Sequence, residues 1–92
     1  MRIVLDEYDW DEIIDLILDD PMSGRVTYSD FDIEIKYECV VDAHYEDDTD
    51  CNCVDSALCT ITDVTGSVMI DYSTKDVEEA ERYITKQLYI SR

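Results

Sequence analysis

Basic residues are scarce in this 92-residue chain, which has seven Lys and Arg against 24 Asp and Glu and a net charge of −17 at pH 7. A protein that binds nucleic acid or an anionic membrane directly needs a basic surface that neutralises phosphate groups. The composition therefore excludes both kinds of direct binding. We expect the partners of this protein to be cationic.

Linkers and repeats are also missing. Only Pro21, Gly24 and Gly66 interrupt the chain, and no unit of roughly 20 to 50 residues recurs. Leu, Ile, Val and Phe make up about a quarter of the residues, more than the roughly 20% below which a highly charged chain stays disordered. We therefore expect one folded, acidic domain that covers residues 1–92.

Long apolar segments do not occur. Asp6, Glu7 and Asp9 stand where a signal peptide needs apolar residues, and no run approaches the roughly 18 apolar residues of a membrane span. We expect a soluble, cytoplasmic protein, in the cytoplasm of the host cell if a phage encodes it.

Catalytic motifs are absent too. The chain has one His and lacks a Gly-rich phosphate loop, a nucleophile elbow and a His-Glu-x-x-His pair. His44 could pair with Cys51 or Cys53, but the surrounding acids are expected to raise the pKa of these thiols and so disfavour a nucleophilic thiolate. We expect neither enzymatic activity nor a cofactor.

The apolar pattern predicts two helices. The segment from Asp9 to Asp20 has a buried stripe at helical spacing and ends before Pro21. A second helix is expected over residues 75–89, where Ser73 and Asp76 have the spacing of a capping box. Its charges are mixed, as on an ordinary solvated helix.

Strand patterns fill the middle of the chain. Residues 31–42 alternate between apolar and polar, a short strand is expected over 25–28, and Ser29 and Asp30 are expected to turn between the two. Residues 57–64 and 67–72 flank Thr65 and Gly66, which predicts a hairpin. Residues 2–5 fit a strand or the approach to the first helix. The expected fold is α+β, an antiparallel sheet of about four strands with an N-terminal and a C-terminal helix packed on it.

Metal ligands occur between residues 39 and 59. A calcium loop that begins at Asp48 would have Cys53 at the position of its required Gly and Cys59 in place of its bidentate Glu. Cys39, Cys51, Cys53 and Cys59 could bind zinc near His44, although Cys51-Asn-Cys53 is shorter than the usual zinc spacing. A disulfide is a further alternative, and reduced thiols are favoured inside a cell. We predict no dedicated metal site.

The negative charge is concentrated in two segments, because residues 1–23 and 42–63 each carry a net charge of −7. In the first segment Asp11, Asp15 and Asp19 recur every four residues. Such like-charged pairs destabilise a helix by about 0.2 to 0.5 kcal/mol each, and Asp19 and Asp20 also oppose the helix dipole. This arrangement indicates that the carboxylates serve a purpose other than stability.

That purpose is interpreted as imitation of DNA. A compact chain of this length has a radius of gyration near 12 Å and a diameter of roughly 30 Å, and about 29 Å of duplex carries 17 charges. Four helical residues rise by about 6 Å, close to the roughly 6.8 Å of two nucleotide steps. The strand face and the acidic connection over 42–55 would supply a second line of charge. The expected partner-binding residues are Asp11, Glu12, Asp15, Asp19, Asp20, Asp32, Glu34, Glu38, Asp42, Glu46, Asp47, Asp48, Asp50 and Asp55.

Two acidic segments resemble a known family. Residues 6–15 (DEYDWDEIID) and 45–50 (YEDDTD), together with the length and charge of the chain, are similar to the Arn-type antirestriction proteins of T-even phages. The resemblance implies a DNA-mimic inhibitor of a host restriction endonuclease of the McrBC type, displacement of a nucleoid protein of the H-NS type, and a homodimer. It transfers only the acidic role, to Asp11, Glu12, Asp15, Asp19, Asp20 and the acids between 32 and 55. An acidic interaction domain for another cationic protein, or a zinc or calcium module, remains the alternative.

Overall fold

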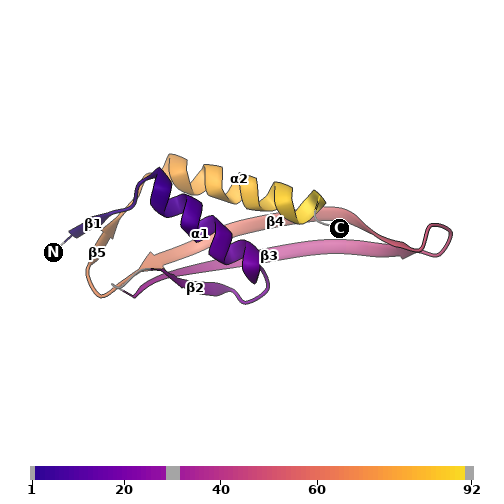
Figure 1. Ribbon diagram of the computed structural model, residues 1–92, viewed down its shortest axis with the longest axis horizontal. Helices are drawn as coiled ribbons and strands as arrows, with labels where there is room; N and C mark the ends of the chain where they lie inside the picture. The colour runs from indigo at the N-terminus through magenta and orange to yellow at the C-terminus, as the bar shows by residue number, and fades with distance from the viewer. Residues whose placement is uncertain (1, 29–31, 91–92) are drawn as a thin grey trace.

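The computed structural model describes residues 2–28 and 32–90 and has the expected α+β fold. Its elements follow one another along the chain (Figure 1) as β1 (Arg2–Val4), α1 (Glu7–Asp19), β2 (Arg25–Tyr28), β3 (Ile33–Glu46), β4 (Cys51–Thr65), β5 (Met69–Asp71) and α2 (Thr74–Ile90). The expected turn at Ser29 and Asp30 and the strand position Phe31 lie outside the described residues. No helix in the described ranges is long and apolar enough to cross a membrane.

The strands form two sheets. Three of them make an antiparallel sheet in the order β2-β3-β4, and β1 pairs with β5 in a separate parallel sheet. The segment 2–5, for which the sequence left two interpretations open, is therefore a strand over Arg2–Val4, and the adjoining Leu5 is buried in the core.

The predicted hairpin around Thr65 and Gly66 is wrong. Strand β4 pairs along its whole length with β3, from Glu34 opposite Thr65 to Glu46 opposite Cys51, while β5 leaves it to pair with β1. The tight two-residue turns of hairpins need a positive φ, and Gly66 does not adopt one. Instead Gly66 packs closely against the side chain of Ile70, where a Cβ atom would lie 3.2 Å from it.

Helix α1 begins two residues earlier than the sequence predicted because Asp6 and Asp9 form a capping box. The Asp9 amide donates to Asp6 Oδ1, and the Asp6 amide donates to Asp9 Oδ2; both distances are 3.0 Å. The helix buries Trp10, Ile13 and Ile17. These contacts fix its outer side toward solvent.

Helix α2 covers the edge of the three-stranded sheet. Strand β4 is an edge strand, and the amides of Cys59 and Ile61 donate to side chains of α2, namely Thr85 Oγ1 at 2.9 Å and Glu81 Oε2 at 2.8 Å. Ala80, Ile84 and Leu88 of the same helix are buried. An edge strand that is closed in this way offers fewer free backbone groups for pairing with another chain.

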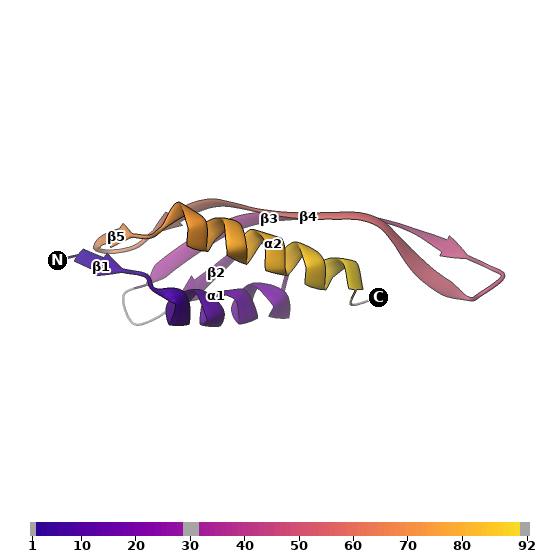
Figure 2. The ribbon, with the colours of Figure 1, turned by 90° about the horizontal axis from the view of Figure 1, so that it is seen from above.

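Both helices lie on one face of the three-stranded sheet (Figures 1 and 2), and the core is formed between them and this face. On β3 the side chains of Ile33, Ile35 and Tyr37 are buried there. Because successive strand residues point to opposite faces, the intervening Glu34, Lys36 and Glu38 lie on the other, open face.

Strands β3 and β4 continue beyond the helices as a two-stranded arm, which we define as residues 42–55. The expectation of an acidic connection there is wrong, because only residues 47–50 form a turn and the rest are paired strands. The arm makes the molecule 57 Å long with a radius of gyration of 15.0 Å. The expected diameter of roughly 30 Å is therefore wrong too, since that estimate assumed a compact chain.

Candidate functional site

The acidic side of α1 is the first part of the candidate site. Its predicted residues Asp11, Glu12, Asp15, Asp19 and Asp20 are all exposed. Within residues 2–28 and 32–90, none of these five carboxylates takes part in a salt bridge. The helix therefore presents a group of carboxylates that no basic side chain in this part of the chain neutralises.

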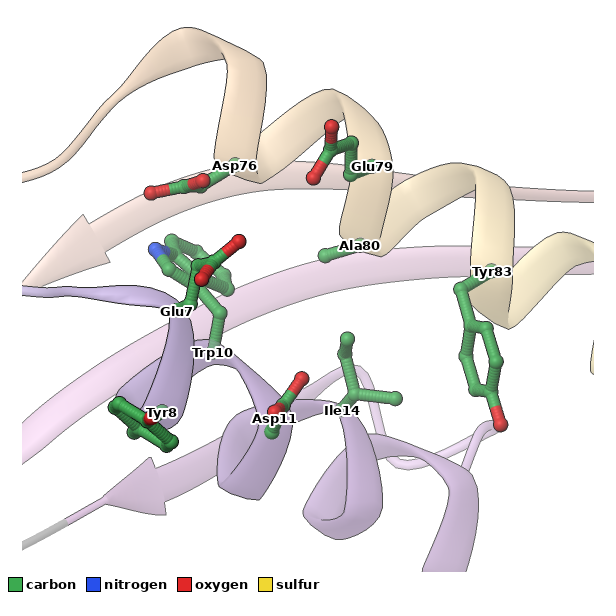
Figure 3. A pocket seen from close by; sticks show the side chains of 9 residues that line it. All are labelled: Glu7, Tyr8, Trp10, Asp11, Ile14, Asp76, Glu79, Ala80 and Tyr83. Carbon is green, nitrogen blue, oxygen red and sulfur yellow. The ribbon is translucent and has the colours of Figure 1, made fainter.

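A groove of about 330 Å³ separates α1 from α2 (Figure 3). Four carboxylates line it, two from each helix: Glu7 and Asp11 of α1, Asp76 and Glu79 of α2. Tyr83 extends from α2 toward α1 (Figure 3) and also borders a smaller hollow beside Asp15. Carboxylates next to aromatic rings suit the side chain of a Lys or Arg residue, which can form charge-assisted hydrogen bonds and cation–π contacts.

Trp10 also lines the groove. The residue is 3% exposed, and its ring meets that of Tyr72 edge to face, with 6.2 Å between the ring centroids. Its Nε1 atom is the only buried side-chain nitrogen or oxygen in the described part of the chain that has no hydrogen-bond partner. An unpaired buried donor costs about 1 to 3 kcal/mol of stability, so the wall of the groove contains one destabilising N–H group.

The sequence did not identify Glu7, Asp76 and Glu79 as site residues. Helix α2 has both acids and bases, and this mixture indicated an ordinary solvated helix. The usable signal is the spacing of Asp76, Glu79 and Tyr83, which places the three on one side of a helix at intervals of three and four residues. Knowing that this side faces α1 requires the packing of the two helices.

The open face of the sheet is more mixed than we predicted. Glu34 is half-buried and lies 3.7 Å from Lys36 and 4.0 Å from Arg25, whereas Glu38 and Asp42 are exposed. Val40 and its cross-strand partner Leu58 are exposed apolar residues between the acids. This face therefore does not form an uninterrupted line of charge.

The two predicted lines of carboxylates do not lie together. The acids of α1 are on the helix layer, and those of β3 point away from it across the sheet, because the alternate residues of β3 are buried under the helices. A single partner surface would have to wrap around the sheet to contact both. On the helix layer, the groove brings acids of α1 and α2 to one side.

The predicted acids near the turns are exposed. Asp47, Asp48 and Asp50 lie at the tip of the arm, where Asp50 has a φ of 52° and accepts a hydrogen bond from Tyr45. Asp32 precedes β3 with a φ of 51°. The stretch that resembled a calcium loop leads from this tip into β4, so it does not have the form of an ion-binding loop.

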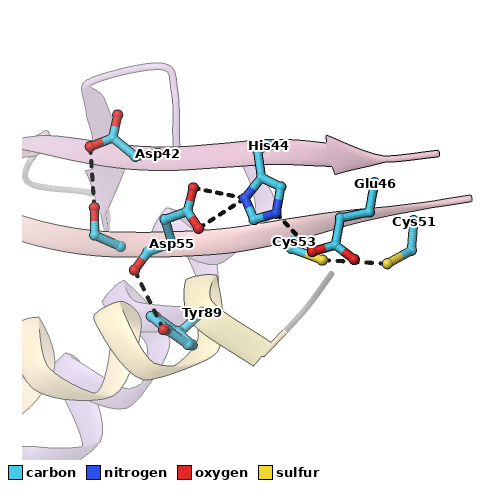
Figure 4. A network of polar contacts seen from close by, with 8 residues as sticks. Asp42, His44, Glu46, Cys51, Cys53, Asp55 and Tyr89 are labelled. Atoms are coloured by element: carbon cyan, nitrogen blue, oxygen red, sulfur yellow. Dashed lines mark hydrogen bonds and ion pairs between the residues drawn. The ribbon is translucent and has the colours of Figure 1, made fainter. Parts of the chain in front are cut away.

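Glu46 and Asp55 contact His44 on the arm (Figure 4). His44 Nδ1 lies 2.9 Å from Asp55 Oδ1, and His44 Nε2 lies 3.1 Å from Glu46 Oε1. The carboxylate of Asp55, followed by that of Glu46, raises the pKa of the imidazole above its ordinary value of 6.5. These two acids are therefore engaged within the chain.

All four cysteines are free thiols. Cys39 and Cys59 face each other across β3 and β4, where Cys59 is buried and Cys39 half-buried. On the arm, Cys51 Sγ lies 3.5 Å from Cys53 Sγ. Hydrogen bonding to Cys51 is the main cause that raises the pKa of Cys53, to about 11, while Thr49 and then Cys53 lower the pKa of Cys51. The expectation that the acids raise both pKa values is wrong for Cys51, whose pKa is lowered by its hydrogen bonds to Thr49 and Cys53.

Comparisons with models of protein families, with curated proteins and with solved structures found no match to this chain.

Proposed function

We propose that this protein is a non-catalytic DNA mimic, which places the carboxylates of its helix layer on the basic DNA-binding surface of another protein and excludes DNA. The observation that carries the proposal is the row Asp11, Asp15 and Asp19, whose exposed carboxylates have no basic partner within the described residues. Across the groove, Asp76 and Glu79 add carboxylates from α2.

The spacing of this row supports the proposal. Residues four apart on a helix rise by about 6 Å, and two nucleotide steps along one DNA strand span about 6.8 Å. The average charge density does not support it, since 57 Å of duplex would carry about 34 charges and the chain has a net charge of −17. The mimicry is therefore local to the helix layer and does not extend over the whole molecule.

The energetics of α1 point the same way. Each like-charged pair four residues apart costs about 0.2 to 0.5 kcal/mol, and the last turn of α1 contains no basic residue to oppose the helix dipole. A cationic partner relieves both costs when it binds. Its field also speeds association at low salt, and added salt screens this effect.

The resemblance of residues 6–15 and 45–50 to antirestriction proteins suggests which partners to test. We propose a restriction endonuclease of the McrBC type as the first partner and a nucleoid protein of the H-NS type as the second. Both are DNA-binding proteins, so the same competition assay serves for each. The mass of the protein in solution would test the homodimer that the resemblance implies.

The test is competition with duplex DNA. The full chain is titrated into a complex of the partner with a fluorescent duplex, and we expect it to release the DNA, with affinity that falls steeply as salt rises. The variant D11K/D15K/D19K should lose binding at least 100-fold. Its free energy of unfolding in urea should equal or exceed that of the wild type. The changes at Asp11 and Asp15 place Lys near Glu7 and Glu12, and the change at Asp19 favours the helix dipole. These gains offset the repulsion that persists among the three Lys side chains.

The matched control is E38K/D42K/D63K, which changes the net charge by the same amount on β3 and β4. We expect this control to retain most of the affinity and to lose only the part that comes from long-range attraction between the net charges of the two proteins. Equal loss in both variants would show that net charge alone drives binding and would contradict the helix-layer proposal. Binding that leaves the DNA in place would favour an acidic interaction domain without mimicry.

A further inference from the structure

The arm carries a group of potential metal ligands on one of its faces. The register of β3 and β4 pairs His44 with Cys53 and Glu46 with Cys51. Residues two apart on a strand point to the same face, as do directly opposed residues on paired strands. The four side chains therefore form a square on one side of the arm (Figure 4).

Their ligand atoms converge. A ring nitrogen of His44, a carboxylate oxygen of Glu46 and the sulfur of Cys53 all lie within 4.8 Å of one another. Cys51 Sγ lies 3.5 Å from Cys53 Sγ and supplies a fourth donor. In a tetrahedral zinc site with bonds of about 2.0 to 2.3 Å, the ligand atoms are about 3.3 to 3.8 Å apart. Cys51 is exposed, so rotation of its side chain toward the other three would complete such a site.

Asp55 orients the imidazole. It contacts His44 Nδ1 at 2.9 and 3.0 Å, which leaves Nε2 on the side of Glu46. A carboxylate on the second nitrogen of a ligating His is the usual support of a zinc site. A register shift between Asp42 and Ala43 leaves Asp55 without a paired residue opposite it. The unpaired position in the strand thus belongs to the residue that orients His44.

The spacing Cys51-x-Cys53 argued against zinc in the sequence, and the structure removes this objection. The longer Cys-x2-Cys spacing suits ligands that bind from a turn. On a strand, positions i and i+2 share a face and bring both thiols to one side.

We infer that His44, Glu46, Cys51 and Cys53 form a binding site for a divalent transition-metal ion, with Zn²⁺ as the best match to thiolate, imidazole and carboxylate donors. The ion replaces the proton between His44 Nε2 and Glu46, and the thiols bind as thiolates. All three protons are released to solvent. The site is separate from the helix layer and does not depend on the proposed function.

The arm has a structural use for such an ion. Every residue from Asp42 to Asn52 is exposed, so no core supports this end of β3 and β4. An isolated two-stranded hairpin is marginally stable in water. A metal ion bound by residues of both strands would fix the register of the arm and slow its opening.

Co²⁺ is the probe for the test because its absorption reports thiolate ligands and tetrahedral geometry. The full chain is reduced, freed of metal and titrated with Co²⁺. We expect charge-transfer and visible bands that saturate at one equivalent and disappear when Zn²⁺ is added. Amide exchange over residues 43–54 should slow on metal binding, whereas exchange in α1 and α2 should not change.

Four variants complete the design. Cys53→Ser and His44→Ala should each weaken Co²⁺ binding at least tenfold, and Asp55→Asn should weaken it by about 10- to 100-fold through its hold on His44. Cys39 lies on the same two strands, in the part that the helices cover. The control variant Cys39→Ser should therefore bind Co²⁺ as the wild type does. The inference is overturned if one equivalent of Co²⁺ gives no thiolate band. It is also overturned if C53S and H44A bind normally, or if a Cys51–Cys53 disulfide persists under reducing conditions.

Discussion

The helix-covered end of β3 and β4 and the arm at their other end belong to the same two strands but are held in different ways. At the covered end, Ile33, Ile35 and Cys59 are almost fully buried against α1 and α2. In the arm, all residues from Asp42 to Asn52 are exposed although their backbone pairing continues to Glu46 and Cys51. Strand pairing alone therefore does not determine where this protein has a core.

The length of the helix layer sets the boundary between the two regions. Helix α2 ends at Ile90, and the hydroxyl of Tyr89 makes a weak contact with the carbonyl of Asp55, 3.5 Å away, at the base of the arm. Beyond this point no helix of residues 2–28 and 32–90 lies over the sheet (Figure 2). We conclude that burial stabilises one end, whereas polar contacts between side chains support the other.

The largest expected effect separates the two regions by stability. Ile84 is fully buried, and Ile84→Ala should lower the free energy of unfolding by about 2 to 5 kcal/mol, because it removes buried methylene groups and leaves a cavity. Val54→Ala in the arm should cost about 1 kcal/mol or less, since Val54 is only half-buried. Urea unfolding followed by the fluorescence of Trp10 measures both. Equal losses would show that the arm contributes to the core and would remove the distinction.

A smaller effect is expected at the closed edge of β4. Thr85→Val keeps the shape of the side chain but removes the acceptor of the Cys59 amide, which should cost about 1 to 3 kcal/mol. Hydrogen exchange of that amide should accelerate by at least tenfold. Thr85→Ser is the matched control, because it keeps the hydroxyl and should preserve the protection. Unchanged exchange in T85V would mean that packing of α2, and not this hydrogen bond, protects the edge.

The sequence predicted the helices and the inner half of β3 because their apolar spacing reflects burial against one core. Helix α1, with Trp10, Ile13 and Ile17 on its buried side, is the clearest example. The sequence did not predict that β4 pairs with β3 as far as Thr65, or that β5 pairs with β1. Strands of mixed polarity do not specify their partners. Gly66 fitted a common hairpin pattern in the sequence, but in the structure it allows the side chain of Ile70 to pack closely against the backbone.

The candidate site was predictable in part. The exposure of the α1 carboxylates follows from their position opposite the buried stripe. That the acids of β3 point away from those of α1 depends on how the helices pack on the sheet, and the sequence alone does not supply that information. The cluster around His44 depends on the cross-strand register, which pairs His44 with Cys53.

The smallest effect concerns the pH response of the arm without metal. Asp55 and then Glu46 raise the pKa of His44 above 6.5, so the folded arm binds the imidazolium proton more tightly than the unfolded chain does. The resulting stabilisation is complete below the unfolded pKa and is lost as the pH rises through the folded pKa.

In metal-free protein, NMR titration of this single His should give a pKa above 6.5. Amide exchange in the arm, corrected for intrinsic exchange rates, should accelerate as the pH rises through this pKa. Asp55→Asn should return the pKa toward 6.5, and Glu46→Gln should lower it less, while exchange at buried residues such as Ile84 stays the same. A His44 pKa at or below 6.5 would show that these carboxylates do not hold the ring in solution, and the polar support proposed for the arm would fail.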